Sequence, residues 1–92
     1  MVKDEFRSLG PEELAQDTLR YLASQVSKRP IMRSLVMSDL NRWDELTGQE
    51  KALALARNVR RVSAVCPWVG QKGRVLDALG AFSVDHTQRA RS

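Results

Sequence analysis

Cysteine and histidine are nearly absent from this 92-residue chain, and both absences restrict its chemistry. Cys66 is the only cysteine, so no disulfide can form within the chain and no Cys/His cluster can hold zinc. His86 is the only histidine, and it lies in a polar stretch with no second group poised to orient it as a general acid or base. We therefore expect neither a metal site nor a catalytic histidine.

Other catalytic signatures are missing as well. The adjacent acids at 12–13 and 44–45 lack the spacing of a two-carboxylate site or of an EF-hand loop. No phosphate-loop lysine motif occurs. We expect Cys66 to be a small buried apolar residue. The sequence thus predicts a protein that is not an enzyme and that takes no cofactor.

Long apolar runs are also lacking. The first ten residues, MVKDEFRSLG, do not contain the apolar core of a secretory signal. Nowhere are there about 18 uninterrupted apolar residues, the length that a membrane-spanning helix needs. We expect a soluble, cytoplasmic protein with no membrane partner.

What the chain does have is an excess of basic residues. Fifteen Lys and Arg against eleven Asp and Glu give a net charge of +4 and a pI near 9.8. This balance favours acidic partners, either an acidic protein surface or nucleic acid. A single domain of 92 residues has a modest core, so pairing with a second copy would be an economical way to add to it.

Two segments have clear helical signals. Pro11, followed by two glutamates, is typical of a helix start, and apolar spacing of three and four residues extends that helix to about residue 28. Thr47 and Glu50 have the spacing of a capping box for a helix that runs to about residue 65. The core face of this second helix comprises Ala52, Leu55, Val59, Val62 and Cys66.

The segment between them, residues 31–46, is less regular. Its apolar residues form a helical stripe: Ile31, Met32, Leu35, Val36, Trp43 and Leu46. Asp39 would fall in the middle of this stripe, and a buried unpaired carboxylate is costly. We therefore expect a break, with Ser38 or Asp39 capping a short helix that carries Leu40 and Trp43. A strand over residues 31–37 is the alternative.

The last predicted helix is short. The stretch RVLDALG, residues 74–80, would bury Val75, Leu76 and Leu79 and end at Gly80, with Phe82 folding back on the core. This divides the chain into an N-terminal arm (1–10), one helical domain (11–82) and a frayed polar tail (83–92). The predicted fold is all-α, a small four-helix orthogonal bundle or helical array, with the helix of residues 11–28 packed on that of residues 47–65.

Three arginines, Arg57, Arg60 and Arg61, lie within five positions on the side of their helix opposite the core face. They have three interpretations: a solvated helix face, a contact with a protein partner, or a contact with phosphates. Two nearby apolar residues favour the protein partner, because Leu53 shares the arginine face and Trp68 lies in a turn. Tryptophan and arginine are favoured at the energetic centres of interfaces. The predicted partner-binding set is Leu53, Arg57, Arg60, Arg61 and Trp68.

Two patterns typical of nucleic-acid binding are partly present. A helix-turn-helix over residues 59–79 would place Pro67 inside its first helix, where proline does not fit. Residues 69–76, VGQKGRVL, resemble the GxxG loop of KH domains, which implies clamping of a single-stranded backbone. A KH domain also needs a three-stranded sheet, so we assign no family. The set expected for nucleic-acid binding is Arg57, Arg60, Arg61, Gly70, Lys72, Gly73 and Arg74.

The sequence therefore predicts a regulatory or inhibitory adaptor that binds a surface of a larger protein. The partner surface is expected to be acidic, and a homodimer is a further expectation. Small basic chains without a catalytic site are common among accessory proteins of phages and mobile elements. The alternative is a DNA- or RNA-binding regulator that uses the arginine face and the loop from Gly70 to Arg74.

Overall fold

The computed structural model describes the backbone of residues 10–91 and the side chains of residues 10–82. This part of the chain contains no strand, which confirms the predicted all-α class and excludes the strand considered for residues 31–37. Its elements are α2 (Pro11–Gln25), α3 (Pro30–Asn41), η1 (Trp43–Glu45), α4 (Gly48–Ser63), η2 (Pro67–Gln71) and α5 (Gly73–Arg91), of which η1 and η2 are 3-10 helices. Residues 1–9, most of the predicted N-terminal arm, lie outside the described residues.

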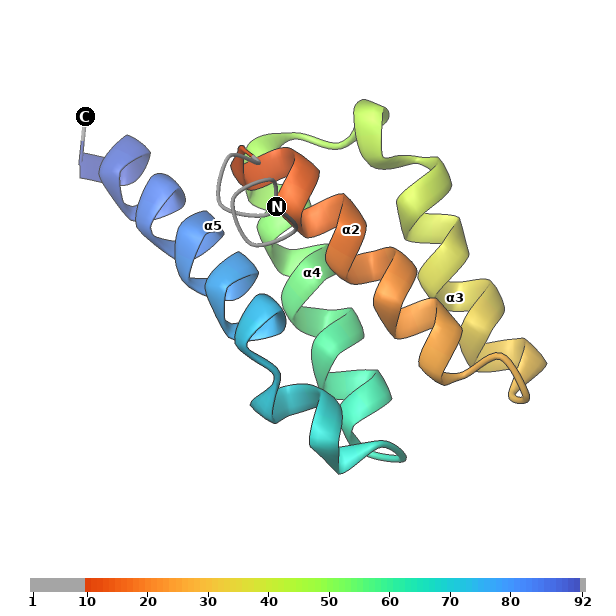
Figure 1. The fold of residues 1–92 in the computed structure, drawn as a ribbon. Helices are drawn as coiled ribbons and strands as arrows, with labels where there is room; N and C mark the ends of the chain where they lie inside the picture. Colours follow the sequence, from red (N-terminus) through yellow and green to blue (C-terminus); the bar gives the residue numbers. More distant parts are fainter. Residues whose placement is uncertain (1–9, 92) are drawn as a thin grey trace.

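Helix α2 is the central element. It has α5 on one side and α3 on the other, with α4 behind them (Figure 1). The predicted packing of the first helix on the capping-box helix is confirmed, because α2 contacts α4. The contacts of α2 with α3 and α5 are more extensive still.

Local sequence explains where α2 begins and ends. Pro11 occupies the first turn with Glu12 and Glu13, where a missing N–H is harmless and carboxylates meet the positive end of the helix dipole. The helix ends at Gln25 rather than at the predicted residue 28. Pro30 opens the next helix, so the residues just before it, including Lys28 and Arg29, form the turn between α2 and α3.

Helix α4 begins with the predicted capping box. The Thr47 Oγ1 accepts a hydrogen bond from the Glu50 N–H at 3.2 Å, and the Thr47 N–H donates to Glu50 Oε1 at 2.9 Å. Two backbone donors at the helix start are thereby satisfied. The face of α4 that was predicted to enter the core is buried, except that Ala52 is half-buried.

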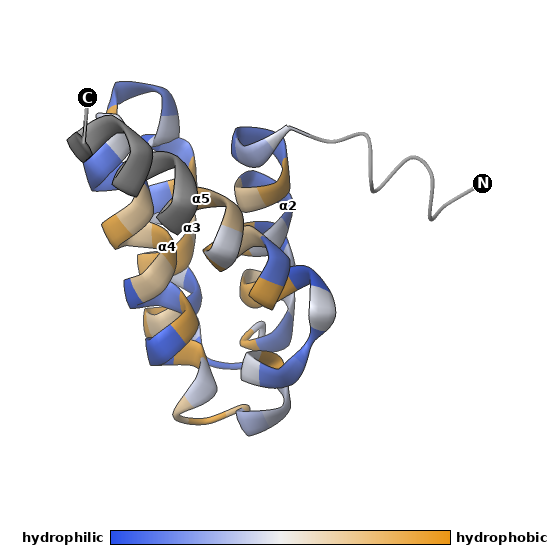
Figure 2. Ribbon diagram, turned by 90° about the vertical axis from the view of Figure 1, so that its left-hand side faces the viewer, coloured by the Kyte–Doolittle hydropathy of each residue, from blue (hydrophilic) through white to orange (hydrophobic). Residues whose placement is uncertain are grey.

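The core lies between the inner faces of the helices, and hydrophobic and hydrophilic residues alternate around each helix (Figure 2). Trp43, in η1, is the largest fully buried side chain of this core. The aromatic rings of Trp43 and Phe82 pack edge to face, with their centroids 5.7 Å apart. Cys66 and Phe82 were predicted to be core residues, and both are buried, as is Trp43.

Helix α5 is longer than predicted. It runs from Gly73 to Arg91, so the helix end placed at Gly80 is wrong, and no helix boundary falls at residue 83. Buried positions continue through the glycine, at Val75, Ala78 and Phe82, and this packing keeps the helix going despite the poor helix propensity of glycine. Leu76, predicted to be buried, is instead 53% exposed.

None of the helices within residues 10–91 combines the length and the apolar character needed to cross a bilayer.

Candidate functional site

The three arginines of α4 do not act as one group. The Arg57 Nη2 donates to Asp39 Oδ2 of α3 at 3.1 Å, and the Arg61 Nη1 donates to Asn58 Oδ1 at 2.8 Å. Arg57 and Arg60 are exposed, and Arg61 is half-buried. The arginine face predicted from the sequence therefore splits into two residues that hydrogen-bond within the chain, Arg57 and Arg61, and the exposed Arg60.

A buried pair lies at the centre of these contacts. Asn58 is fully buried, and its Nδ2 donates to Asp39 Oδ2 at 2.8 Å and to the Ala54 carbonyl at 2.8 Å. Because Asp39 receives both this bond and the one from Arg57, its carboxylate is compensated although the residue is only 9% exposed. We call these four residues the polar seam: Asp39, Arg57, Asn58 and Arg61.

The polar seam corrects the prediction for residues 31–46. The break expected at Ser38 or Asp39 is wrong, because α3 continues through both residues to Asn41. Trp43 then lies in the 3-10 helix η1 rather than in a second α-helix. The expectation assumed that a carboxylate in the middle of an apolar stripe would lack a partner, and α4 supplies two.

A hollow of about 560 Å³ lies at one end of the polar seam, between the α2–α3 turn and the end of α4. We call it the basic hollow. Its apolar residues come from the start of α3, and three cationic residues join them: Lys28, Arg29 and Arg61. The described residues that line it are Lys28, Arg29, Pro30, Ile31, Met32, Leu35 and Arg61.

A second hollow, of about 380 Å³, lies at the other end, where α3 ends and α4 begins. It contains residues of both charges, and we call it the mixed hollow. Asp39 and Arg57 of the polar seam reach it, and Glu50 of the capping box lies at its margin. Its lining, within the part of the chain that the structure describes, is Asp39, Arg42, Leu46, Glu50, Leu53, Ala54 and Arg57.

Large apolar side chains are exposed along the same pair of helices. Ile31 is 79% exposed and Leu35 is 45% exposed on α3, and Leu53 is 59% exposed on α4. Ile31 and Leu35 line the basic hollow, and Leu53 lines the mixed hollow. Together with the polar seam, these residues make the α3–α4 face, which we take as the candidate functional site.

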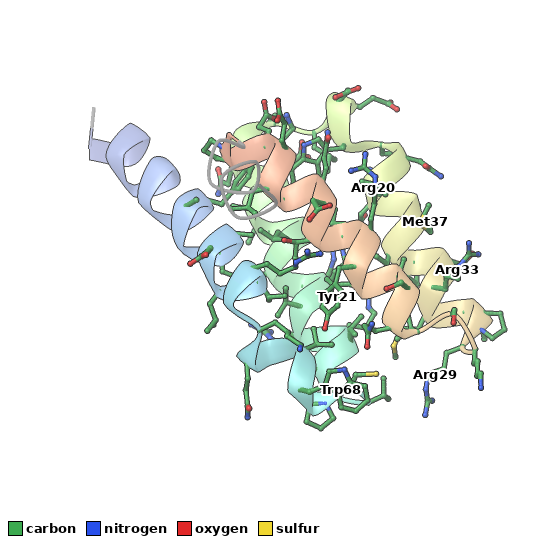
Figure 3. The ribbon with its side chains drawn as sticks, viewed as in Figure 1. Arg20, Tyr21, Arg29, Arg33, Met37 and Trp68 are labelled. Atoms are coloured by element: carbon green, nitrogen blue, oxygen red, sulfur yellow. The ribbon has the colours of Figure 1, made fainter. Side chains whose placement is uncertain are left out.

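Trp68 is separate from the α3–α4 face. It lies in η2, at the end of the bundle where α2 gives way to α3 and where Arg29 is also found (Figure 3). The Trp68 Nε1 donates to Gln25 Oε1 of α2 at 2.9 Å, and the residue remains 51% exposed. It therefore does not line either hollow, although it was predicted to belong to the same binding set as Leu53.

The loop from Gly70 to Arg74 is also separate, because it joins α4 to α5. Arg74 forms an ion pair with Asp17 of α2 at 3.3 Å and lies over the Tyr21 ring, whereas Lys72 is exposed. Gly70 approaches α4 closely, since an added Cβ would lie 3.2 Å from the Ser63 Oγ. Neither Gly70 nor Gly73 has a positive φ. The nucleic-acid set is thus divided between the α3–α4 face and this loop.

Sequence reasoning missed the two buried members of the polar seam and the basic hollow. Asn58 carries no helical signal of its own, although a polar residue between Leu55 and Val62 on a buried face was a usable indication. Ile31 and Leu35 were assigned to a buried stripe. Among the described side chains, no group of three or more His, Cys, Asp or Glu is placed to hold a metal ion.

Comparisons with protein-family models, with curated proteins and with solved structures found no match to this chain.

Proposed function

We propose that this protein is a small non-enzymatic adaptor, regulatory or inhibitory, that acts in the cytoplasm by occupying a surface of a larger protein through its α3–α4 face. The observation that carries the proposal is the exposure of Ile31, Leu35 and Leu53 along one pair of helices. Single exposed apolar side chains are ordinary, but apolar groups gathered in hollows and rimmed by polar residues are typical of interaction sites.

Charge supports an acidic partner. The chain has a net charge of +4, and five basic residues line the two hollows: Lys28, Arg29, Arg42, Arg57 and Arg61. Arg60 lies exposed on the same helix as Leu53. Such a field speeds the encounter with an anionic surface and disfavours basic ones. The partner is either a different protein or a second copy of this chain.

A capture experiment tests the proposal. The chain is immobilised and exposed to an extract of its source cells, and the retained proteins are compared between variants. Leu53→Asp replaces an apolar side chain of the α3–α4 face with a charged one. The matched control is Leu76→Asp, which makes the same change at a similarly exposed leucine of α5, on the opposite side of α2 from α3 (Figure 1). We expect Leu53→Asp to abolish retention of a discrete partner, and Arg60→Ala to weaken it less.

Two outcomes would contradict the proposal in this form. Equal retention by the wild type, Leu53→Asp and Leu76→Asp would remove the α3–α4 face from the interaction. Small and equal effects of Leu53→Asp and Arg60→Ala would show that Leu53 is not an apolar anchor of the interaction. Light scattering on the same variants tests the homodimer, which should dissociate with Leu53→Asp.

Nucleic-acid binding is the second candidate, favoured by the exposed Arg60 and Lys72. Fluorescence anisotropy with labelled duplex and single-stranded oligonucleotides tests it at low and near-physiological salt. Binding through phosphates falls steeply with salt and survives shuffling of the nucleotide sequence. Saturable binding at the higher salt that is lost with Arg60→Ala and Lys72→Ala would favour this candidate over the adaptor.

A further inference from the structure

We propose that the basic hollow is the docking site for an acidic amphipathic helix of the partner protein. This inference rests on the proposed function and specifies the partner's chemistry. It assigns the apolar side of the partner helix to the hollow's floor and its carboxylates to the surrounding cations.

The floor of the basic hollow is apolar, so it would pack against apolar side chains of the partner. Ile31, which is 79% exposed, and Leu35, which is 45% exposed, stand one helical turn apart on α3, with Pro30 and Met32 beside them. Burying such side chains against a partner removes apolar surface from water, which is the dominant favourable term in most association. The hollow, about 560 Å³ in volume, is open to solvent, so it can receive side chains from a partner's surface.

The rim of the basic hollow is cationic, so it would attract negatively charged groups of the partner. Lys28, Arg29 and Arg61 line it, and among the described side chains no acidic residue does. The mixed hollow differs in this respect, because Asp39 and Glu50 line it together with Arg42 and Arg57. The basic hollow therefore presents uncompensated cations beside exposed apolar groups, which is the complement of an acidic amphipathic segment.

Arg61 is held in position for such a contact. Its Nη1 donates to Asn58 Oδ1 at 2.8 Å, and Asn58 is itself fixed by bonds to Asp39 and Ala54. A guanidinium has five N–H donors, so the bond to Asn58 leaves donors that can meet a carboxylate. A cation whose position is set before binding loses less conformational freedom on binding than a mobile lysine does.

A helical partner fits the shape of the site. Helices α3 and α4 run side by side in opposite directions, because Ile31 at the start of α3 shares the hollow with Arg61 near the end of α4. A third helix laid along such a pair inserts side chains spaced three and four residues apart, a common mode of peptide recognition. Phosphate backbones would meet the cations but would leave Ile31 and Leu35 uncovered.

Synthetic peptides test the inference. The probes are fluorescently labelled amphipathic helical peptides with leucine, phenylalanine or tryptophan anchors on one side and glutamate on the other. The full chain is titrated into each by anisotropy at about 0.15 M salt, where exposed charges are largely screened beyond about 8 Å. Each peptide has two controls: a scrambled sequence of the same composition, and a version with lysine in place of glutamate. We expect binding that is about tenfold or more weaker for both controls.

Variants then locate the binding. Ile31→Gln/Leu35→Gln removes the floor without changing charge, and Lys28→Gln/Arg29→Gln removes part of the rim without changing the floor. We expect the first pair to weaken binding by about tenfold or more and the second by roughly threefold to tenfold. Leu76→Gln, at an exposed leucine of α5, should leave binding unchanged.

The inference is overturned if none of the acidic amphipathic peptides binds, or if the scrambled or lysine versions bind as tightly. It is also overturned if anionic phosphatidylserine vesicles bind with the same dependence on Ile31 and Leu35 while the peptides do not. Failure here is distinguishable from failure of the proposed function: a partner captured from extract and lost with Leu53→Asp would keep the adaptor role and remove only this occupant.

Discussion

The basic and mixed hollows lie on the same pair of helices, yet the polar groups that line them differ in their hydrogen-bond partners. In the mixed hollow Asp39 is bound by Arg57 and Asn58, and Glu50 is bound to the backbone of Thr47. In the basic hollow the cations lie beside exposed apolar side chains, and no carboxylate of residues 10–82 shares the lining. The contrast teaches that two hollows on one face can differ in how far the chain itself compensates their charges.

The largest effect should come from Asn58, the residue that connects the two halves of the face. Asn58→Ala removes three hydrogen bonds and leaves Asp39 with only the partly exposed Arg57. We expect the free energy of unfolding to fall by about 2–3 kcal/mol, measured by urea unfolding with circular dichroism.

Asn41→Ala, at an exposed asparagine that ends α3, is the matched control and should stay within about 0.5 kcal/mol. Equal effects of the two substitutions would mean that the polar seam contributes nothing to stability, and the two hollows would then not differ as described.

A smaller effect should follow at the edge of the mixed hollow. Thr47→Ala removes the acceptor for the Glu50 N–H and should lower the free energy of unfolding by about 1 kcal/mol. Thr47→Ser keeps the oxygen and should retain most of that stability. If both substitutions cost the same in urea unfolding, the capping box does not account for the start of α4.

Glu50→Gln sharpens the comparison because it changes charge without breaking the cap, since glutamine also serves at this position. The substitution removes one of the two negative charges among the described residues that line the mixed hollow, so that its net charge becomes more like that of the basic hollow. We expect unchanged stability and an affinity for acidic amphipathic peptides that rises about twofold, measured by anisotropy. A lower affinity would show that the glutamate assists binding, against the charge argument.

The smallest effect on stability should come from the floor of the basic hollow. Ile31 is 79% exposed, so Ile31→Gln should change the free energy of unfolding by less than about 0.5 kcal/mol. Thermal and urea unfolding check this directly. A loss above 1 kcal/mol would mean that Ile31 supports the fold, and its exposure would then not indicate a surface kept for a partner.

The elements with strong local signals were predictable, and those that depend on distant partners were not. Pro11 and the Thr47–Glu50 pair set helix starts through neighbouring residues, and both are found where the sequence places them. Asp39 misled the prediction because its partner Asn58 is 19 residues away. No local pattern shows which carboxylate will be met by an amide from another helix.

The candidate site was predictable only in part. Periodicity placed Leu53 and Arg57 outside the core face of α4, where they are exposed. It also placed Ile31 and Leu35 in one apolar stripe with Val36, but neighbouring helices cover only part of α3, so Val36 is buried and the other two are not. The width of a stripe can be read from a sequence, whereas how much of it the neighbours cover depends on how the helices pack.

The polar seam also fixes the register of α3 against α4. Sliding α3 by one turn would bring Leu35 opposite Asn58 and would take the Asp39 carboxylate away from its amide partner. A purely apolar contact would tolerate such a slip, since one hydrocarbon side chain replaces another at modest cost. A buried amide facing a carboxylate does not, because the mismatched state leaves polar groups without partners. This pair therefore favours the alignment of the two helices in which Ile31 and Arg61 line the same hollow.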